Sequence, residues 1–113
     1  MSAASALAYV RAQRPRFLTE LKEFIRFPSV SAQLRHAEDR VRCARWLASR
    51  LRRIGLDKVK LVSSPDAPIV YAEWRHAPGK PTVLIYGHYD GSSSRFLSSL
   101  NSPSSPSRSC GEP

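Results

Sequence analysis

The chain contains few cysteines, few acidic residues and no long apolar run. Cys43 and Cys110 are the only cysteines among 113 residues and do not form a CxxC pair, which argues against a disulfide framework or a thiolate zinc site. A reducing compartment fits this cysteine usage, and we expect a cytoplasmic protein. The apolar runs are too short to span a membrane. No basic stretch precedes the first apolar run, so a secretory signal is not predicted, while an organelle transit peptide stays an alternative.

Basic residues outnumber acidic ones: 18 Lys and Arg stand against 9 Asp and Glu, which gives a formal net charge of +9. Much of this charge lies in "RVRCARWLASRLRR", residues 40–53, which could bind nucleic acid or an anionic membrane surface. Its arginines are spread around much of the helical circumference, however, and no known nucleic-acid recognition motif accompanies them. We therefore favour a solvated helix face, with no specific nucleic acid and no membrane as partners.

The composition changes after residue 90. Residues 1–90 hold 16 Lys and Arg and 8 acids, whereas residues 91–113 hold ten Ser and three Pro in 23 positions. A segment of that kind buries too little apolar surface to offset its ordering entropy. We therefore predict a folded part over 1–90 and a disordered tail over 91–113.

Two helices are predicted in the first part. The first has apolar residues at helical spacing, namely Phe17, Leu21, Phe24 and Ile25. Pro15 marks its first turn or a bend, and the helix should stop before Pro28, with a loop over 28–39. The second should run from about His36 to Ile54 and end at Gly55 in a left-handed conformation. Its inward stripe consists of Val41, Ala44, Leu47, Ala48, Leu51 and Ile54.

Strands are predicted after the helices. "KVKLV" (58–62) alternates, "PIVYAEW" (68–74) is β-branched and aromatic, and "APGKP" (77–81) has the composition of a turn. "TVLIYG" (82–87) is a continuous apolar run, which is typical of a central strand covered on both faces. The order of helix, helix and three strands predicts the beginning of an α/β domain with an incomplete sheet.

His88 and Asp90 follow this third strand and lie two residues apart. On a strand, residues at that spacing share a face, about 6.5–7 Å apart. The carboxyl end of a strand is also where open α/β sheets bind ligands. A neutral imidazole is a good zinc ligand, and a neighbouring carboxylate can orient it. From spacing alone, a histidine and an aspartate satisfied by solvent and backbone remain the simpler interpretation.

Three segments in order resemble the N-terminal part of a large zinc-peptidase family: "FLTELKEFIRFPSVSA", "HAEDRVRCARWLASRLRRIGL" and "PIVYAEWRHAPGKPTVLIYGHYD". The family includes acetylornithine deacetylase, succinyl-diaminopimelate desuccinylase and the carnosine-type dipeptidases, and "GHYD" is most similar to the dipeptidase branch. The resemblance covers about residues 17–90. It implies the N-terminal portion of a three-layer α/β catalytic domain with two zinc ions, which hydrolyses dipeptides or small peptides and can form homo-oligomers.

The resemblance also implies roles for two residues. His88 would ligate one zinc ion, and Asp90 would be the catalytic-site aspartate that clamps and polarises that histidine. Tyr89 would face the other way. For metal-assisted amide hydrolysis, the resemblance further implies a bridging aspartate, a glutamate general base, more carboxylate ligands and a second histidine.

Those further ligands lie downstream of "HxD" in the family, but here only one acid, Glu112, and no histidine follow Asp90. We therefore expect a truncated metallopeptidase that does not hold zinc stably and is inactive by itself. A changed reading frame after codon 90 would explain the abrupt end of the pattern; a splice variant and a wrongly predicted gene end are alternatives. A non-enzymatic fragment, which pairs with a full-length subunit or binds anions through its basic helix, is the other functional hypothesis.

Six further residues have simpler structural interpretations. We expect His36 and His76 to be surface histidines, and Cys43 to be a small core or boundary residue. Trp46 and Trp74 are expected in the core or at a domain contact. Cys110 would be an exposed thiol in the tail.

Overall fold

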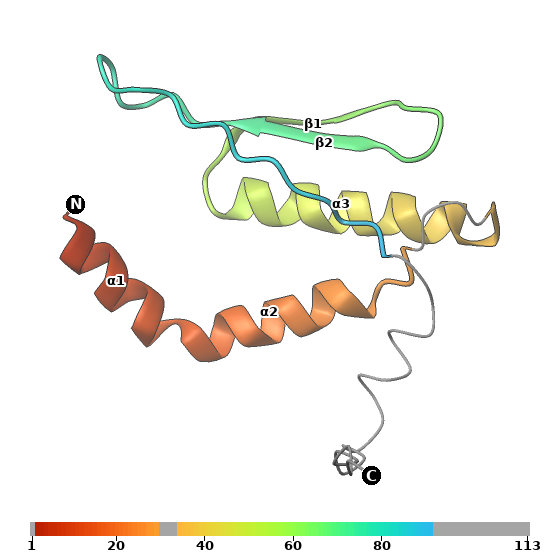
Figure 1. Cartoon of the computed structure of the whole chain (residues 1–113), viewed down its shortest axis with the longest axis horizontal. Coiled ribbons are helices and arrows are strands. Elements are labelled where there is room, and N and C mark those ends of the chain that lie inside the picture. Colours follow the sequence, from red (N-terminus) through yellow and green to blue (C-terminus); the bar gives the residue numbers. More distant parts are fainter. Residues whose placement is uncertain (1, 30–33, 92–113) are drawn as a thin grey trace, which may run out of the picture.

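The computed structural model describes residues 2–29 and 34–91. In chain order the elements are helices α1 (Ala3–Ala12) and α2 (Arg14–Arg26), a short 3-10 turn (Leu34–His36), helix α3 (Ala37–Arg53) and strands β1 (Asp57–Val62) and β2 (Ile69–Glu73). Figure 1 shows α3 between helix α2 on one side and the β1–β2 hairpin on the other. The predicted tail, including Cys110 and all of residues 92–113, lies outside the described residues. No described helix has the length and apolar character needed to cross a membrane.

Helix α1 was not predicted from the sequence, and α2 was. Ser2 caps α1 through a reciprocal pair of hydrogen bonds with Ser5, a capping box. Gln13 separates the two helices, and Pro15 lies in the first turn of α2, where its missing N–H costs nothing. The chain bends between the helices (Figure 1). Helix α2 ends at Arg26, before Pro28, as predicted.

Helix α3 confirms the predicted second helix. Its first turn contains Glu38 and Asp39 and its last turn three arginines, a distribution that suits the helix dipole. Gly55 has a φ of 94°. The Gly55 N–H donates to the carbonyl of Arg52, and the Leu56 N–H donates to the carbonyl of Leu51, both at 3.1 Å. This pair of hydrogen bonds is a Schellman cap, so Gly55 ends the helix in the way that its position predicted.

Strands β1 and β2 form an antiparallel two-stranded sheet, which confirms the first two predicted strands. The register shifts between Asp57 and Lys60. Lys58 lies in this irregular stretch with a φ of 48°, in the left-handed region that a lysine seldom adopts. A bulge of this kind increases the local twist of the hairpin.

The core is small and lies on one face of α3. Cys43, Ala44 and Ala48 are at most 1% exposed, so Cys43 is a core residue as predicted. Arg40 on the same face is 6% exposed, and its Nε donates to the carbonyl of Asp66 at 3.1 Å. The predicted stripe is correct at Ala44 and Ala48, but Ile54 is 68% exposed, because the helix ends at Arg53 and no described element covers the next turn.

Helix α2 contacts the other side of α3 through aromatic and charged side chains. The Phe24 and Trp46 rings stack with centroids 5.6 Å apart, so Trp46 lies half-buried between two helices, where we had expected it in the core or at a domain contact. The Arg50 guanidinium lies over the Trp46 ring, 5.0 Å from its centroid. Arg50 also pairs with Glu20 at 3.3 Å and Glu23 at 2.7 Å. This half-buried cluster joins the two helices.

The third predicted strand is wrong. Residues 82–87 form neither helix nor strand, and their apolar side chains are 80–90% exposed: Val83, Leu84, Ile85 and Tyr86. A central strand needs neighbours on both edges and layers on both faces, and the sheet in the described residues has two strands only. The observed fold is therefore mixed helix with a two-stranded sheet, as in part of an α/β domain.

Candidate metal-binding site around His88

The candidate site lies at the end of residues 80–91, where the chain returns to the body of the fold. Ser29, which is 5% exposed, anchors this return. Its hydroxyl donates to the Tyr89 carbonyl at 2.6 Å, and its own carbonyl accepts from the Gly91 N–H at 2.8 Å. These two hydrogen bonds hold the backbone on either side of Asp90 against the loop that follows α2.

His88 contacts two side chains on the same side of the chain. Its Nδ1 lies 3.3 Å from Oδ1 of Asp90, and its Nε2 lies 2.9 Å from the hydroxyl of Tyr86. Residues 86, 88 and 90 therefore form a row with the two-residue spacing of an extended chain. The structure thus brings together the histidine and aspartate that the sequence singled out. The His88 side chain is 66% exposed, so water reaches the imidazole.

Tyr89 is directed elsewhere, as strand alternation predicts. Its hydroxyl donates to the carbonyl of Pro68, beside the start of β2. Burial is the main cause that raises the pKa of the Tyr89 phenol above its ordinary value. Tyr89 and Ser29 together fix the backbone, while the His88 side chain stays accessible.

The three histidines lie apart, each paired with a different carboxylate. His36 Nδ1 lies 3.0 Å from Asp39, and the His36 side chain is only 16% exposed. The His36 side chain is therefore less exposed than we expected of a surface histidine, and its Nε2 is buried without a hydrogen-bond partner among the described residues. His76 pairs with Asp57 and is exposed at 62%, as predicted.

The described residues do not fit a complete metal centre. A catalytic zinc site uses three protein ligands and an open position. Within residues 2–29 and 34–91, no group of three or more His, Cys, Asp or Glu side chains could hold an ion. His88 and Asp90 supply one imidazole and the carboxylate that orients it. This arrangement can position a single ligand, and no chemical step through a metal follows from it.

Trp74 differs from its expected place. It is 55% exposed, and its ring meets that of His76 edge-on at 5.5 Å. The strand β2 ends at Glu73, so Trp74 lies beyond the hairpin, where no described element covers it. The prediction of a core or domain contact is wrong within the described residues.

Several arginines of α3 are engaged within the fold. Arg50 pairs with α2, Arg42 lies 3.4 Å from Asp39, and Arg52 donates to the Val59 carbonyl at 3.4 Å. Arg40 is buried against the hairpin loop. These arginines have partners on different sides of α3. This agrees with the prediction that the positive charges are spread around the helix.

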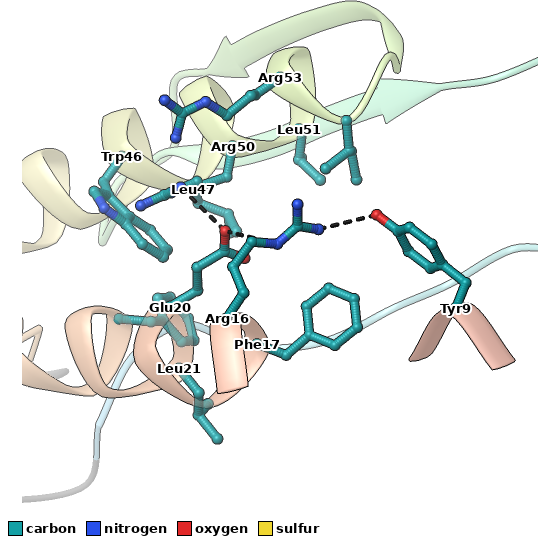
Figure 2. Close-up of a pocket in the computed structure, with 12 residues that line it drawn as sticks. Tyr9, Arg16, Phe17, Glu20, Leu21, Trp46, Leu47, Arg50, Leu51 and Arg53 are labelled. Atoms are coloured by element: carbon teal, nitrogen blue, oxygen red, sulfur yellow. Dashed lines mark hydrogen bonds and ion pairs between the residues drawn. The ribbon is translucent and has the colours of Figure 1, made fainter. Parts of the chain in front are cut away.

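A cleft lies between the helices, on the side of α3 that faces α2. It is a cleft of about 580 Å³ to which α1, α2 and α3 contribute. Figure 2 shows Tyr9, Phe17 and Trp46 around it, with the Arg16 guanidinium donating to the Tyr9 hydroxyl at 3.0 Å. None of the residues that line the cleft comes from the segment with His88, so this cleft and the candidate metal ligand are separate features.

Sequence reasoning assigned no role to Ser29 or Tyr86, although both contact the candidate site. Ser29 is 60 residues from Tyr89 in sequence, so no local pattern links them. Tyr86 could have been found, because strand alternation places it on the face of His88. It was instead included in the apolar run of a buried strand.

Comparison with known proteins supports a relation to dipeptidases. The chain is 31% identical over 77 residues to a cysteinylglycine-S-conjugate dipeptidase of Corynebacterium striatum, with 68% of this chain and 17% of the relative covered. It is 34% identical over 89 residues to a Cys-Gly metallodipeptidase of Candida albicans, covering 68% of this chain and 18% of the relative. It is 33% identical over 94 residues to a Beta-Ala-His dipeptidase of Rattus norvegicus, covering 73% and 19%.

The chain spans about a fifth or less of the length of these curated relatives. No protein-family model matches it. No solved structure matches it either.

Proposed function

We propose that this chain is a truncated portion of a zinc-dependent dipeptidase, from the start of a three-layer α/β catalytic domain. The observation that carries the proposal is the placement of His88 and Asp90 in mutual contact, in a chain whose relatives are dipeptidases. In this proposal His88 is a metal ligand, and Asp90 positions its ring. The substrate class is a dipeptide or small peptide, as the names of the relatives suggest.

The chain itself is proposed to be inactive. The whole sequence contains three histidines, at positions 36, 76 and 88. Two of them are already paired with carboxylates far from His88 in sequence, Asp39 and Asp57. A single imidazole with one oriented carboxylate lacks the ligands for two metal ions and the general base that amide hydrolysis needs.

Residues 91–113 are proposed to be read out of frame relative to the longer family members. The change in composition after residue 90 and the loss of acidic residues support this. Sequencing the transcript and the genomic DNA through codon 90 tests it. Another frame that encodes the missing aspartate, glutamates and histidine is the expected result, and their absence from all frames would contradict it.

A chimeric enzyme tests the roles of His88 and Asp90. Residues 17–90 would replace the aligned stretch of the Candida albicans metallodipeptidase. We expect the chimera to hydrolyse Cys-Gly. Replacing Asp90 with Asn should lower kcat/KM by about 10–100-fold, as for other residues that orient a metal ligand, and His88→Ala should lower it further.

The matched control is His76→Ala, because His76 is an equally exposed histidine that pairs with a carboxylate outside the candidate site. It should leave kcat/KM unchanged. Full activity in the His88→Ala chimera would contradict the proposed role.

A further inference from the structure

The segment 80–90 has the properties of a strand without a neighbour. Residues 82–87 are uncharged, and no backbone–backbone hydrogen bond joins them to another described residue. None of the residues from 80 to 90 has a positive φ, so the segment can extend without strain. Both ends are fixed, by the turn that joins the Lys80 N–H to the Ala77 carbonyl at 3.2 Å and by the Ser29 contacts at Tyr89 and Gly91.

Such a segment offers a row of free N–H and C=O groups for pairing with another strand. The exposed side chains are the aliphatic and aromatic types that favour strands, including Val83 at 80% and Ile85 at 90% exposure. The partner must therefore supply a strand with apolar side chains. It must also carry charges complementary to Lys80 and Asp90, the charged residues at the two ends of the segment.

We propose that the partner is a second copy of this chain, paired antiparallel through residues 80–90 about a two-fold axis at Ile85. Pairing residues whose numbers sum to 170 places Lys80 directly opposite Asp90 at both ends. A two-fold interface repeats every contact, so one such pair generates a second. This charge complementarity selects a register that an uncharged strand would leave open.

The same register pairs the remaining side chains favourably. Leu84 lies opposite Tyr86, and Val83 opposite Gly87, while Ile85 meets its own copy. An aromatic side chain opposite an aliphatic one is a stabilising cross-strand contact. Asp90 already contacts His88, but a carboxylate accepts several hydrogen bonds and can take the Lys80 ammonium as well.

Pro81 does not prevent this pairing. It lacks an N–H, but it lies at the start of the proposed strand, a position where proline is tolerated. Its counterpart in the register is Tyr89, whose carbonyl already accepts from Ser29. The ladder therefore depends mainly on residues 82–88.

Charge exchange tests the register in the full chain at 0.15 M salt, the ionic strength at which exposed charges more than about 8 Å apart are largely screened. We expect sedimentation velocity to show a dimer of the 12.6 kDa chain. Lys80→Asp or Asp90→Lys alone creates two like-charge pairs and should weaken dimerisation roughly tenfold. The double variant K80D/D90K restores both pairs and should dimerise like the parent.

Cysteine cross-linking provides a second readout with a matched control. In a Cys110→Ser background, Ile85→Cys places two thiols opposite each other, with Cα atoms about 4.5–5.5 Å apart, within disulfide range. Ile85→Cys should form a covalent dimer under mild oxidation. Leu84→Cys should not, because Leu84 faces Tyr86, although Leu84 and Ile85 are both 90% exposed.

Three results would overturn the proposal. One is a chain that stays monomeric at about 100 μM, a concentration at which an interface with a micromolar Kd would be largely formed. Another is a charge exchange that does not restore dimerisation, which would indicate association without this register. The third is equal cross-linking of the two cysteine variants. Circular dichroism of each variant checks that the fold of α3 and the hairpin is retained.

Discussion

The buried face of α3 and the segment 82–87 are both apolar, but their exposure is opposite. Ala44 and Ala48 are 0% and 1% exposed, whereas Leu84 and Ile85 are each 90% exposed. The face of α3 packs against a hairpin that follows it directly in sequence. The apolar run has no neighbouring strand within the described residues. Apolar composition by itself therefore does not bury a segment; partners at the right place in the chain are also required.

The largest difference in stability between the two regions is expected when a single charge is introduced into each of them. Ala48→Asp would bury an unpaired carboxylate, which costs several kcal/mol after relaxation, a large share of the ~5–15 kcal/mol that stabilises a typical domain. We expect the variant to lose its helical circular dichroism signal at room temperature.

Leu84→Asp is the matched change in the exposed segment. In the monomer, at a protein concentration below the Kd of the proposed dimer, it should alter the free energy of unfolding by less than about 0.5 kcal/mol, as surface substitutions do. Urea unfolding measures both variants. A destabilised Leu84→Asp monomer would show that the apolar run is packed in solution.

The two tryptophans allow the same comparison of a packed and an exposed residue, with a smaller expected effect on stability. Trp46 stacks on Phe24 and lies under Arg50, whereas Trp74 is 55% exposed. Trp46→Ala should cost roughly 1–3 kcal/mol, less than a fully buried aromatic, and Trp74→Ala about 0.5 kcal/mol or less. Equal effects on the urea midpoint would contradict the described contact between α2 and α3.

The smallest effect is expected in the hairpin, as a change of its stability with pH. Hydrogen bonds from Lys58 and then Tyr71 lower the pKa of Glu73, so the stabilisation by this carboxylate is present above the ordinary glutamate pKa. It is lost as the pH falls through the depressed pKa, below the ordinary range of a glutamate. NMR titration should find the Glu73 pKa below its ordinary range. Glu73→Gln should remove that part of the acid dependence of the melting temperature, and an unshifted Glu73 would contradict the contact.

Local signals in the sequence predicted most of the body correctly. Apolar residues at helical spacing predicted α2 and α3, and Pro28 and Gly55 predicted where these helices end. Alternating and β-branched residues predicted β1 and β2. These features depend on residues close together in the chain, so short windows contain the necessary information. Helix α1 was missed because its apolar residues do not form a clear stripe.

Long-range contacts could not be predicted in the same way. The hydrogen bond from Ser29 reaches Tyr89 across 60 residues, and no local pattern indicated the low exposure of the His36 side chain. The mutual contact of His88 and Asp90 was predictable, because two-residue spacing alone places them on one side of an extended chain. The prediction that residues 82–87 are buried was wrong. An apolar run indicates that a strand needs neighbouring strands and covering layers, but it does not show whether the chain provides them.

Hydrolysis by the purified 113-residue chain tests the central claim most directly. The chain would be incubated with zinc or manganese and with Cys-Gly, and free glycine would be measured against the full-length Candida albicans relative under the same conditions. The account predicts no release above the rate of the metal alone, because one imidazole and one carboxylate cannot assemble the centre. Cleavage that a chelator abolishes, and that His88→Ala removes, would contradict it.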